Sequence, residues 1–446
     1  MSSQVSDEVA PGVTLRGFLT LALPALGVLA AEPLYLLLDV AVVGRLGADA
    51  LAGLAMGALV LGLVSTQLTF LSYGTTARAA RMFGAGRRGD AVNEGVQATW
   101  MAVVIGTVLA AAVFTTASPL LSLLAGDGEI AADAGQWLRI AILGTPLILI
   151  TLAGNGWMRG VQDTMRPLRC VLAGLAVSAV LCPVLVFGLL GAPEWGLAGS
   201  AVANLVGQVL AAALFIWALV AERQSLAPQW PVMRAQLSMA RDLVLRSLGF
   251  QACFLSAAAV AARFGAPALA AHQVVLQLWN FITLTLDSLA IAAQAMIGAA
   301  LGAAQVTHAR RLAWRITGWS LGLAAALAAA IALLAPVLPK VFTDDGSVLA
   351  EIGSVWWLFA LLIPLGGVAF ALDGVLLGSG DVAFLRTATL ASAVLGFLPL
   401  IWLSLMLGWG LTGIWWGLVL FMALRVVAVL WRTASGKWAV PGSVRA

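Results

Sequence analysis

Residues 45–52 read RLGADALA, and residues 263–270, which lie 218 positions later, read RFGAPALA. The same offset places FGA at 83–85 over LGA at 301–303, and it places Pro146 over Pro364. A likeness that keeps one offset over such a distance indicates an internal duplication. The chain is therefore expected to fold as two similar halves.

The composition of the chain is that of a membrane protein. Of its 446 residues, 62% are hydrophobic and 10% are charged, whereas a soluble protein carries about 25% charged residues. Apolar runs long enough to cross a hydrocarbon core of about 30 Å recur along the chain. The apolar runs, bounded by Gly, Pro and charged residues, predict twelve membrane spans. They lie at about 16–44, 49–83, 89–116, 130–156, 164–190, 196–221, 236–263, 266–300, 307–338, 348–375, 382–407 and 410–433.

Each half contains six of these spans, which is an even number, so both halves face the same way across the membrane. The predicted fold is an all-α polytopic membrane protein with twelve transmembrane helices in two pseudo-symmetric six-helix bundles. Parallel repeats of this kind are typical of transporters. The expected organisation is an N-terminal tail (1–15), an N-lobe (16–221), an inter-lobe linker (222–235), a C-lobe (236–433) and a C-terminal tail (434–446).

The distribution of positive charge predicts the orientation. If the N-terminus is cytoplasmic, 20 of the 24 Lys and Arg residues fall in inside loops and tails, and only Arg45, Arg139, Arg263 and Lys340 fall outside. Such a bias favours cytoplasmic N- and C-termini in a plasma (inner) membrane. The basic residues lack the interleaved aromatic pattern that would favour nucleic-acid binding.

No cofactor or metal site is predicted. The three cysteines lie in apolar stretches, which does not suggest a disulfide framework, and His272 and His308 stand alone and far apart. An intramembrane prenyl transferase would need Asp-rich Mg²⁺ sites, and the sequence has no DDxxD-like cluster. We therefore do not expect an enzyme, whereas a receptor is harder to exclude.

Two carboxylates lie in the first span, in AEPLYLLLDVAVVGRLG at residues 31–47. Helical spacing puts Glu32, Tyr35 and Asp39 on one face, beside Pro33, which can kink the helix. Ionisable groups inside a membrane usually mark a pathway or a proton relay. Asp39 has Ala257 as its repeat partner, so the duplication does not explain it. Asp39 is interpreted as a proton-binding residue, with simple capping by polar neighbours as the alternative, and the role of Glu32 stays open.

The eighth span carries a polar strip. A strip with near-heptad spacing cannot face lipid without leaving amide groups unpaired, so it is expected to line a cavity or a seam between helices. Its members are Gln273, Gln277, Asn280, Asp287 and Gln294.

Further polar positions inside the spans are assigned to the substrate cavity or to packing. Asp373 is an intramembrane acid whose repeat partner is Asn155, and Asn204 shares a helix face with Gln208. Gly298 and Gly302 have the spacing of a close helix-packing site.

Taken together, LALPALGVLAAEPLYLLLDVAVVGRLG, RFGAPALAAHQV, TLDSLAIAAQ and LDGVLLGSGD resemble the multidrug and toxic compound extrusion (MATE) family, with Asp287 and Asp373 pointing to its DinF-like branch. The resemblance covers nearly the whole chain. It implies secondary antiport, in which an ion enters while a bulky, amphiphilic or cationic compound leaves. It also implies that Asp39 is the first-span acid linked to cation coupling and that Pro24 is a hinge, to which we add Pro33 as a second hinge candidate.

The sequence departs from sodium-coupled relatives. The fifth span has no Asn or Asp, and the seventh has only Gln251 in place of a Glu, while Gln294 stands where DinF-like relatives can carry Glu. These departures favour proton coupling, with sodium coupling as the alternative. The predicted protein is a monomeric proton-coupled exporter of drug-like small molecules, with membrane lipids as its other partners.

A lipid-linked oligosaccharide flippase of the same superfamily is the second alternative. Such a protein should place several cationic residues in its cavity to hold pyrophosphate. The intramembrane charges are expected to be acidic, which disfavours it.

Overall fold

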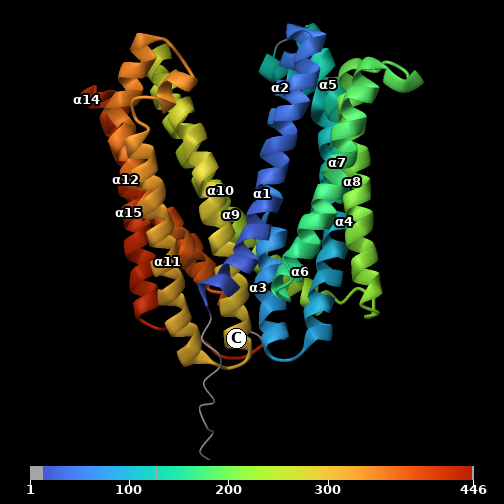
Figure 1. Ribbon diagram of the computed structural model, residues 1–446, viewed down its shortest axis with the longest axis vertical. Helices are drawn as coiled ribbons and strands as arrows, with labels where there is room; N and C mark the ends of the chain where they lie inside the picture. Colours follow the sequence, from blue (N-terminus) through green and yellow to red (C-terminus); the bar gives the residue numbers. More distant parts are fainter. Residues whose placement is uncertain (1–13, 126–127, 444–446) are drawn as a thin grey trace, which may run out of the picture.

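The computed structural model describes residues 14–125 and 128–443. Within them, twelve helical segments are long and apolar enough to cross a membrane. They form two lobes that meet at one end and diverge toward the other, so that the molecule has the outline of a V (Figure 1). The prediction of an all-helical, two-lobed membrane protein is confirmed.

The N-lobe contains the first six spans, two of which are interrupted. The second span divides into two helices at Thr69, and the fourth divides at the 3₁₀ turn Ile142–Gly144, which Pro146 follows. Proline at a helix start suits such a break, because its missing N–H would be unpaired there anyway. Both breaks lie inside single candidate spans, Ala48–Gly84 and Glu129–Gly160, which agree with the predicted ranges 49–83 and 130–156. The N-lobe helices are α1 (Leu15–Val43), α2 (Ala48–Leu68), α3 (Phe70–Gly84), α4 (Arg88–Ala125), α5 (Glu129–Ala141), α6 (Thr145–Gly160), α7 (Met165–Phe187) and α8 (Gly196–Ala221).

The C-lobe repeats this plan with one break, a π-helical turn at Ala393–Phe397 in its fifth span. Its helices are α9 (Trp230–Arg263), α10 (Ala266–Gly302), α11 (Val306–Leu333), α12 (Gly346–Gly378), α13 (Val382–Ser392), α14 (Leu398–Leu407) and α15 (Gly410–Ala434).

The linker between the lobes is shorter than predicted, because α9 begins at Trp230 rather than at residue 236. The linker lies along α4, where Trp100 Nε1 donates to the carbonyl of Leu226 at 2.8 Å and Gln97 Nε2 donates to that of Ala227 at 2.9 Å. Most of the predicted N-terminal tail (1–15) lies outside the described residues.

Helix α1 contains both predicted hinge prolines, yet it runs unbroken past Pro24 and Pro33. Proline removes the hydrogen bond to the carbonyl four residues earlier. For Pro24 this is the carbonyl of Thr20, which instead accepts a hydrogen bond from Thr164 Oγ1 of the segment before α7 at 3.4 Å. The α1 backbone therefore lacks one helical hydrogen bond at Pro24, and the Thr20 carbonyl that this leaves free is bonded to Thr164 instead.

The lobes touch where α3 packs against α10. Added Cβ atoms would lie 1.9 Å from the carbonyl oxygen of Ala299 at Gly84 and 2.0 Å from that of Arg81 at Gly302. Glycine permits such a close approach of two backbones. Gly298 also faces this seam, against Ala80, so the close packing predicted for Gly298 and Gly302 is confirmed.

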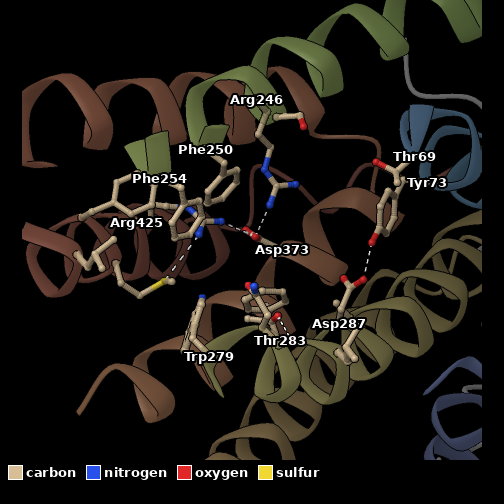
Figure 2. Close-up of a pocket in the computed structure, with 18 of the residues that line it drawn as sticks. Thr69, Tyr73, Arg246, Phe250, Phe254, Trp279, Thr283, Asp287, Asp373 and Arg425 are labelled. Carbon is tan, nitrogen blue, oxygen red and sulfur yellow. Dashed lines mark hydrogen bonds and ion pairs between the residues drawn. The ribbon is translucent and has the colours of Figure 1, made fainter. Parts of the chain in front are cut away.

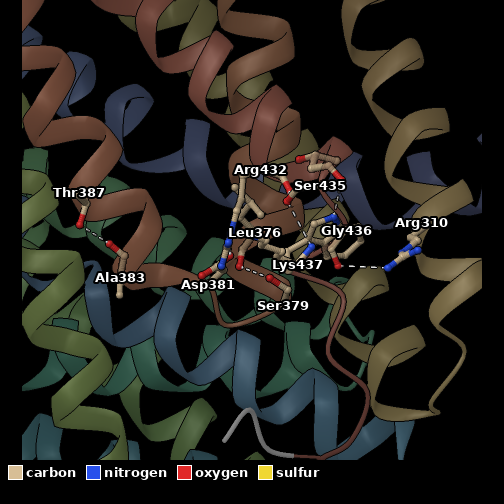
Figure 3. A network of polar contacts seen from close by, with 12 residues as sticks. Arg310, Leu376, Ser379, Asp381, Ala383, Thr387, Arg432, Ser435, Gly436 and Lys437 are labelled. Atoms are coloured by element: carbon tan, nitrogen blue, oxygen red, sulfur yellow. Dashed lines mark hydrogen bonds and ion pairs between the residues drawn. The ribbon is translucent and has the colours of Figure 1, made fainter.

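The segment after α15, residues 435–443, which we call the C-terminal strap, crosses this closed end. Arg81 of α3 donates to the carbonyls of Val440 at 3.1 Å and Gly442 at 2.9 Å, and to that of Ser379 after α12 at 2.8 Å. The beginning of the strap is held by Arg310 of α11, which donates to the carbonyl of Gly436 at 3.3 Å (Figure 3). The described part of the predicted C-terminal tail is thus packed against both lobes.

Candidate functional site

Each lobe contains a pocket of about 340 Å³. This is the size range of small-molecule sites. The C-lobe pocket is lined mainly by α9, α10, α12 and α15, together with α3 of the other lobe, and the N-lobe pocket by α1, α3, α6, α7 and α8. Tyr73 of α3 lines both pockets, so the two share a wall at the vertex of the V.

Several aromatic side chains form one wall of the C-lobe pocket (Figure 2). Phe250 and Phe254 come from α9, Trp279 from α10 and Phe421 from α15. Aromatic rings offer large apolar contact areas with little loss of rotamer freedom. The pocket is therefore suited to a ligand with a flat apolar part.

A charged triad lies against this wall. Asp373 Oδ2 accepts hydrogen bonds from Nη2 of both Arg246 and Arg425, each at 2.5 Å. The Phe250 ring centre lies 4.7 Å from the guanidinium carbon of Arg425 and 5.6 Å from that of Arg246. Cation–π contacts at such distances stabilise a guanidinium in an apolar setting. The triad carries a formal charge of +1, two arginines against one aspartate.

These arginines correct the prediction that the intramembrane charges are acidic. Arg246 and Arg425 were assigned to inside loops, and so was Arg159, which lines the N-lobe pocket. The assignment was wrong because it did not consider how deep each arginine lies within its span. The predicted spans 236–263 and 410–433 already contain positions 246 and 425 well inside their ends, and that position was the available signal.

Asp287 of α10 links the two lobes. Tyr73 Oη donates to Asp287 Oδ2 at 2.6 Å, and Gln294 Nε2 of the same helix donates to the Tyr73 carbonyl at 2.6 Å. Two members of the predicted polar strip thus make contacts across the interface, and one of them, Asp287, also lines the C-lobe pocket together with Asn280. Gln273 and Gln277, nearer the start of α10, are exposed and line neither pocket.

The N-lobe pocket is lined by two charged side chains and several polar ones. Glu32, Asn155 and Arg159 line it, and Arg159 Nη1 donates to Ser72 Oγ at 3.4 Å. Gln208 lines this pocket as well, whereas Asn204, one turn away on α8, does not.

Asp39 lies apart from both pockets, buried between α1, α7 and α8 with 1% of its surface exposed. Its Oδ1 accepts hydrogen bonds from Ser200 Oγ at 2.6 Å and from Cys182 Sγ at 3.3 Å. Its Oδ2 is buried and has no hydrogen-bond partner among residues 14–125 and 128–443. Tyr35 is buried one turn away, whereas Glu32 turns toward the pocket.

These features define a class of protein, a two-lobed helical membrane transporter with a cargo-sized pocket in each lobe. The MatE family model matches residues 24–184 and 243–402, one stretch in each lobe. The chain therefore belongs to the MATE family of multidrug and toxic compound efflux transporters, and the resemblance seen in its sequence is confirmed. Transporters of this family are not enzymes.

Individual relatives agree with this assignment. The chain is 33% identical to Protein DETOXIFICATION 44, chloroplastic, of Arabidopsis thaliana, over 96% of this chain and 84% of the relative. It is 28% identical to DNA damage-inducible protein F of Escherichia coli (strain K12), over 94% of this chain and 92% of the relative. The latter is consistent with the DinF-like branch.

Solved structures share the fold. A MATE crystal structure in the bent conformation superposes with a TM-score of 0.87 at 21% identity, covering 95% of this chain and 96% of that one. A MOP superfamily transporter from Pyrococcus furiosus, whose structure is described as having a binding pocket of reversed polarity, superposes with a TM-score of 0.85 at 20% identity, covering 95% and 96% of the two chains.

Proposed function

We propose that this protein exports amphiphilic compounds in exchange for protons by alternating access, with Asp39 as the protonation site. In this proposal the cargo binds in the pocket of either lobe, and the proton binds at Asp39 inside the N-lobe. The termini are cytoplasmic, so the open end of the V faces outward across the plasma membrane. The protein acts as a monomer, and its two lobes (16–221 and 236–433) move as units.

The burial of Asp39 is the observation that carries the proposal. Asp39 forms no ion pair with a described residue and one of its carboxylate oxygens has no hydrogen bond. A buried carboxylate without a cationic partner is costly in its charged form. Binding a proton removes the cost, so this site changes its preferred state when a proton arrives or leaves.

The surroundings of Asp39 support a proton over sodium. Hard cations prefer several oxygen ligands, and one of the two groups bonded to Asp39 is the thiol of Cys182. The other neighbour is the single hydroxyl of Ser200. This donor set offers few oxygen atoms besides the carboxylate itself.

Cargo and proton need not touch in this mechanism. Each needs only to favour a different state of the lobes, because a ligand shifts an equilibrium by its differential affinity for the two states. Helix α1 carries Asp39 and also the hinge candidates Pro24 and Pro33. Bending of α1 on protonation would then change the N-lobe pocket, which Glu32 of the same helix lines.

The proposal is tested by transport in proteoliposomes that hold a pH gradient of either direction and contain choline in place of sodium. The wild type should export a fluorescent amphiphile only when protons flow the opposite way. Asp39→Asn, which keeps the shape of the side chain, should abolish this response, because the amide cannot take up the proton.

Glu32→Gln is the matched control, because Glu32 is an acid on the same helix as Asp39 but lines the N-lobe pocket. We expect it to alter cargo affinity while retaining the dependence on the gradient. Continued pH-driven export by Asp39→Asn, or transport that stops when sodium is removed, would show that the proposed coupling is wrong.

A further inference from the structure

The hydrogen bonds of the C-lobe triad leave donors unused. Arg246 reaches Asp373 through Nη2 alone, and its Nε and Nη1 have no hydrogen-bond partner in the described part of the chain. Arg425 also donates to Asp373 only through Nη2, and its Nη1 donates to the sulfur of Met422 at 3.7 Å. A guanidinium has five donor hydrogens, so the pair is far from satisfied by one carboxylate oxygen.

The two arginines differ in exposure. The side chain of Arg425 is 2% exposed and that of Arg246 is 14% exposed. Arg425 and Asp373 therefore form the more buried pair. The Nε of Arg246 is also buried, so the free edge of Arg246 consists of Nη1 and the second hydrogen of Nη2. In Figure 2 one terminal nitrogen of Arg246 points to Asp373 and the other points away from it, toward the α3 side.

The second acid of the pocket does not neutralise this edge by direct contact. Asp287 is bonded to Tyr73, and no ion pair joins it to Arg246 or Arg425 among residues 14–125 and 128–443. The triad has a surplus of one positive charge, and Asp287, on the α10 side of the same pocket, brings the formal charge of the four groups to zero. With so little positive charge available, the pocket suits a monoanion held at Arg246 better than a diphosphate.

From this arrangement we infer that the C-lobe pocket binds amphiphilic monoanions, with a carboxylate held by the free edge of Arg246 and an aromatic body packed among Phe250, Phe254 and Trp279. Arginine binds carboxylates through two parallel N–H donors, and here the wall beyond it is aromatic. Asp373 acts as an internal competitor that holds the arginines when the pocket is empty. This inference rests on the proposed export function and names a substrate class for it, anionic rather than cationic.

Binding of 2-naphthoate by the purified protein in lipid nanodiscs tests the inference. Tritiated 2-naphthoate is displaced by unlabelled naphthoate, by 2-naphthamide and by 2-naphthylmethylammonium, which share one ring system and differ in charge. Naphthoate should compete at least about tenfold better than the amide, the scale of one charge-assisted hydrogen bond, and the ammonium should compete least.

Three variants locate the site. Arg246→Gln should weaken naphthoate binding about tenfold or more and leave naphthamide binding largely unchanged, and Arg246→Lys should give an intermediate loss, because lysine keeps the charge without the fork. Asp373→Asn should tighten naphthoate binding, because it removes the competing carboxylate. The control is Arg263→Gln on the same helix, an exposed arginine 5.9 Å from the Trp402 ring centre, which should leave affinity unchanged.

Retained naphthamide binding and a single size-exclusion peak show that the Arg246 variant is folded. Stronger competition by the ammonium, unchanged naphthoate affinity in Arg246→Gln, loss of naphthoate binding in Asp373→Asn, or absence of saturable naphthoate binding would each overturn the inference. The assay contains no ion gradient, so its outcome is independent of whether Asp39 couples transport to protons.

Discussion

Tyr73 Oη donates a hydrogen bond of 2.6 Å to Asp287 Oδ2, and this bond joins α3 of the N-lobe to α10 of the C-lobe where the two pockets meet. The same tyrosine is held through its backbone carbonyl by Gln294 at 2.6 Å. Any motion that separates the lobes at this end must break the side-chain bond, so Tyr73 and Asp287 form a contact specific to the state described here.

Tyr73→Phe should therefore shift the population of lobe arrangements. The change removes the donor and leaves the acceptor carboxylate in place, which costs this state about 1–3 kcal/mol. Electron–electron distances between spin labels at the exposed positions Ala48 and Ala266, at the starts of α2 and α10, would report the separation across the open end. We expect a new population with a shorter separation, and an unchanged distribution would show that the bond does not hold this state.

The seam between α3 and α10 offers a second way to disturb the same equilibrium. A Cβ at Gly302 would lie 2.0 Å from the backbone oxygen of Arg81, and a backbone atom cannot rotate away. Gly302→Ala should therefore separate the helices and lower the melting temperature, with an overpacking cost of about 1–3 kcal/mol.

The matched control is Gly318→Ala on α11, where no atom lies within 4 Å of the added Cβ. This substitution should be neutral or raise stability by about 0.5–1 kcal/mol, because alanine loses less backbone entropy in a helix. Equal melting temperatures for the two variants would argue against a tight α3–α10 seam.

Arg81 is expected to hold the C-terminal strap in place. Its guanidinium is buried and donates to carbonyls of Ser379, Val440 and Gly442. Arg81→Ala removes all three charge-assisted bonds, each worth about 1.5–3 kcal/mol, so residues 435–443 should become sensitive to protease while the helices stay intact.

Limited proteolysis followed by mass spectrometry measures this release. Arg88→Ala serves as the control, because Arg88 is about half exposed and pairs with Glu222 rather than with the strap, and such a surface pair contributes at most about 1 kcal/mol. Cleavage of the strap at the same rate in both variants would mean that Arg81 does not anchor it.

Asp345 gives a pH-dependent contribution outside the membrane spans. It caps the start of α12, and hydrogen bonds from the Ser347 hydroxyl and the backbone N–H groups of Ser347 and Val348 lower the pKa of its carboxyl below the ordinary 3.8. Because the folded-state pKa is depressed, the stabilisation is complete above the ordinary pKa and is lost as pH falls through the lower folded value.

The difference in melting temperature between wild type and Asp345→Ala isolates this cap from other carboxylates. It should be constant at neutral pH and should shrink on acidification below about pH 4, where the unfolded-state carboxyl begins to bind protons. A difference that grows as the pH falls would contradict the direction of the shift.

The helices and their number were predictable because hydropathy is a local property. Each span is a run of apolar residues, and the 218-residue offset between RLGADALA and RFGAPALA established the duplication without any contact information. The break at Thr69 was not predictable, because no Gly or Pro lies among residues 65–73. The turn at Ala393–Phe397 had a signal that was not used, because Gly396 lies in it and Pro399, which lacks an N–H, follows it.

The candidate site was predictable only in part. Asn280, Asp287 and Asp373 stood out as polar groups inside apolar spans, and all three line the C-lobe pocket. Arg246 and Arg425 were mistaken for loop anchors, because the rule that collects Arg in cytoplasmic loops does not measure how deep a residue lies in its span.

By itself the sequence determined that this is a duplicated, twelve-span helical membrane protein with acids in its first, eighth and tenth spans, since composition and periodicity suffice for that. Only the tertiary structure decided what those acids meet. It placed Asp39 between α7 and α8 with no Arg or Lys of the described chain paired to it, bonded Asp287 to Tyr73 across the lobes, and gave Asp373 two arginines from α9 and α15. Charges separated by many residues find one another only when the helices that carry them pack together, and in an apolar interior that pairing sets the character of the pocket.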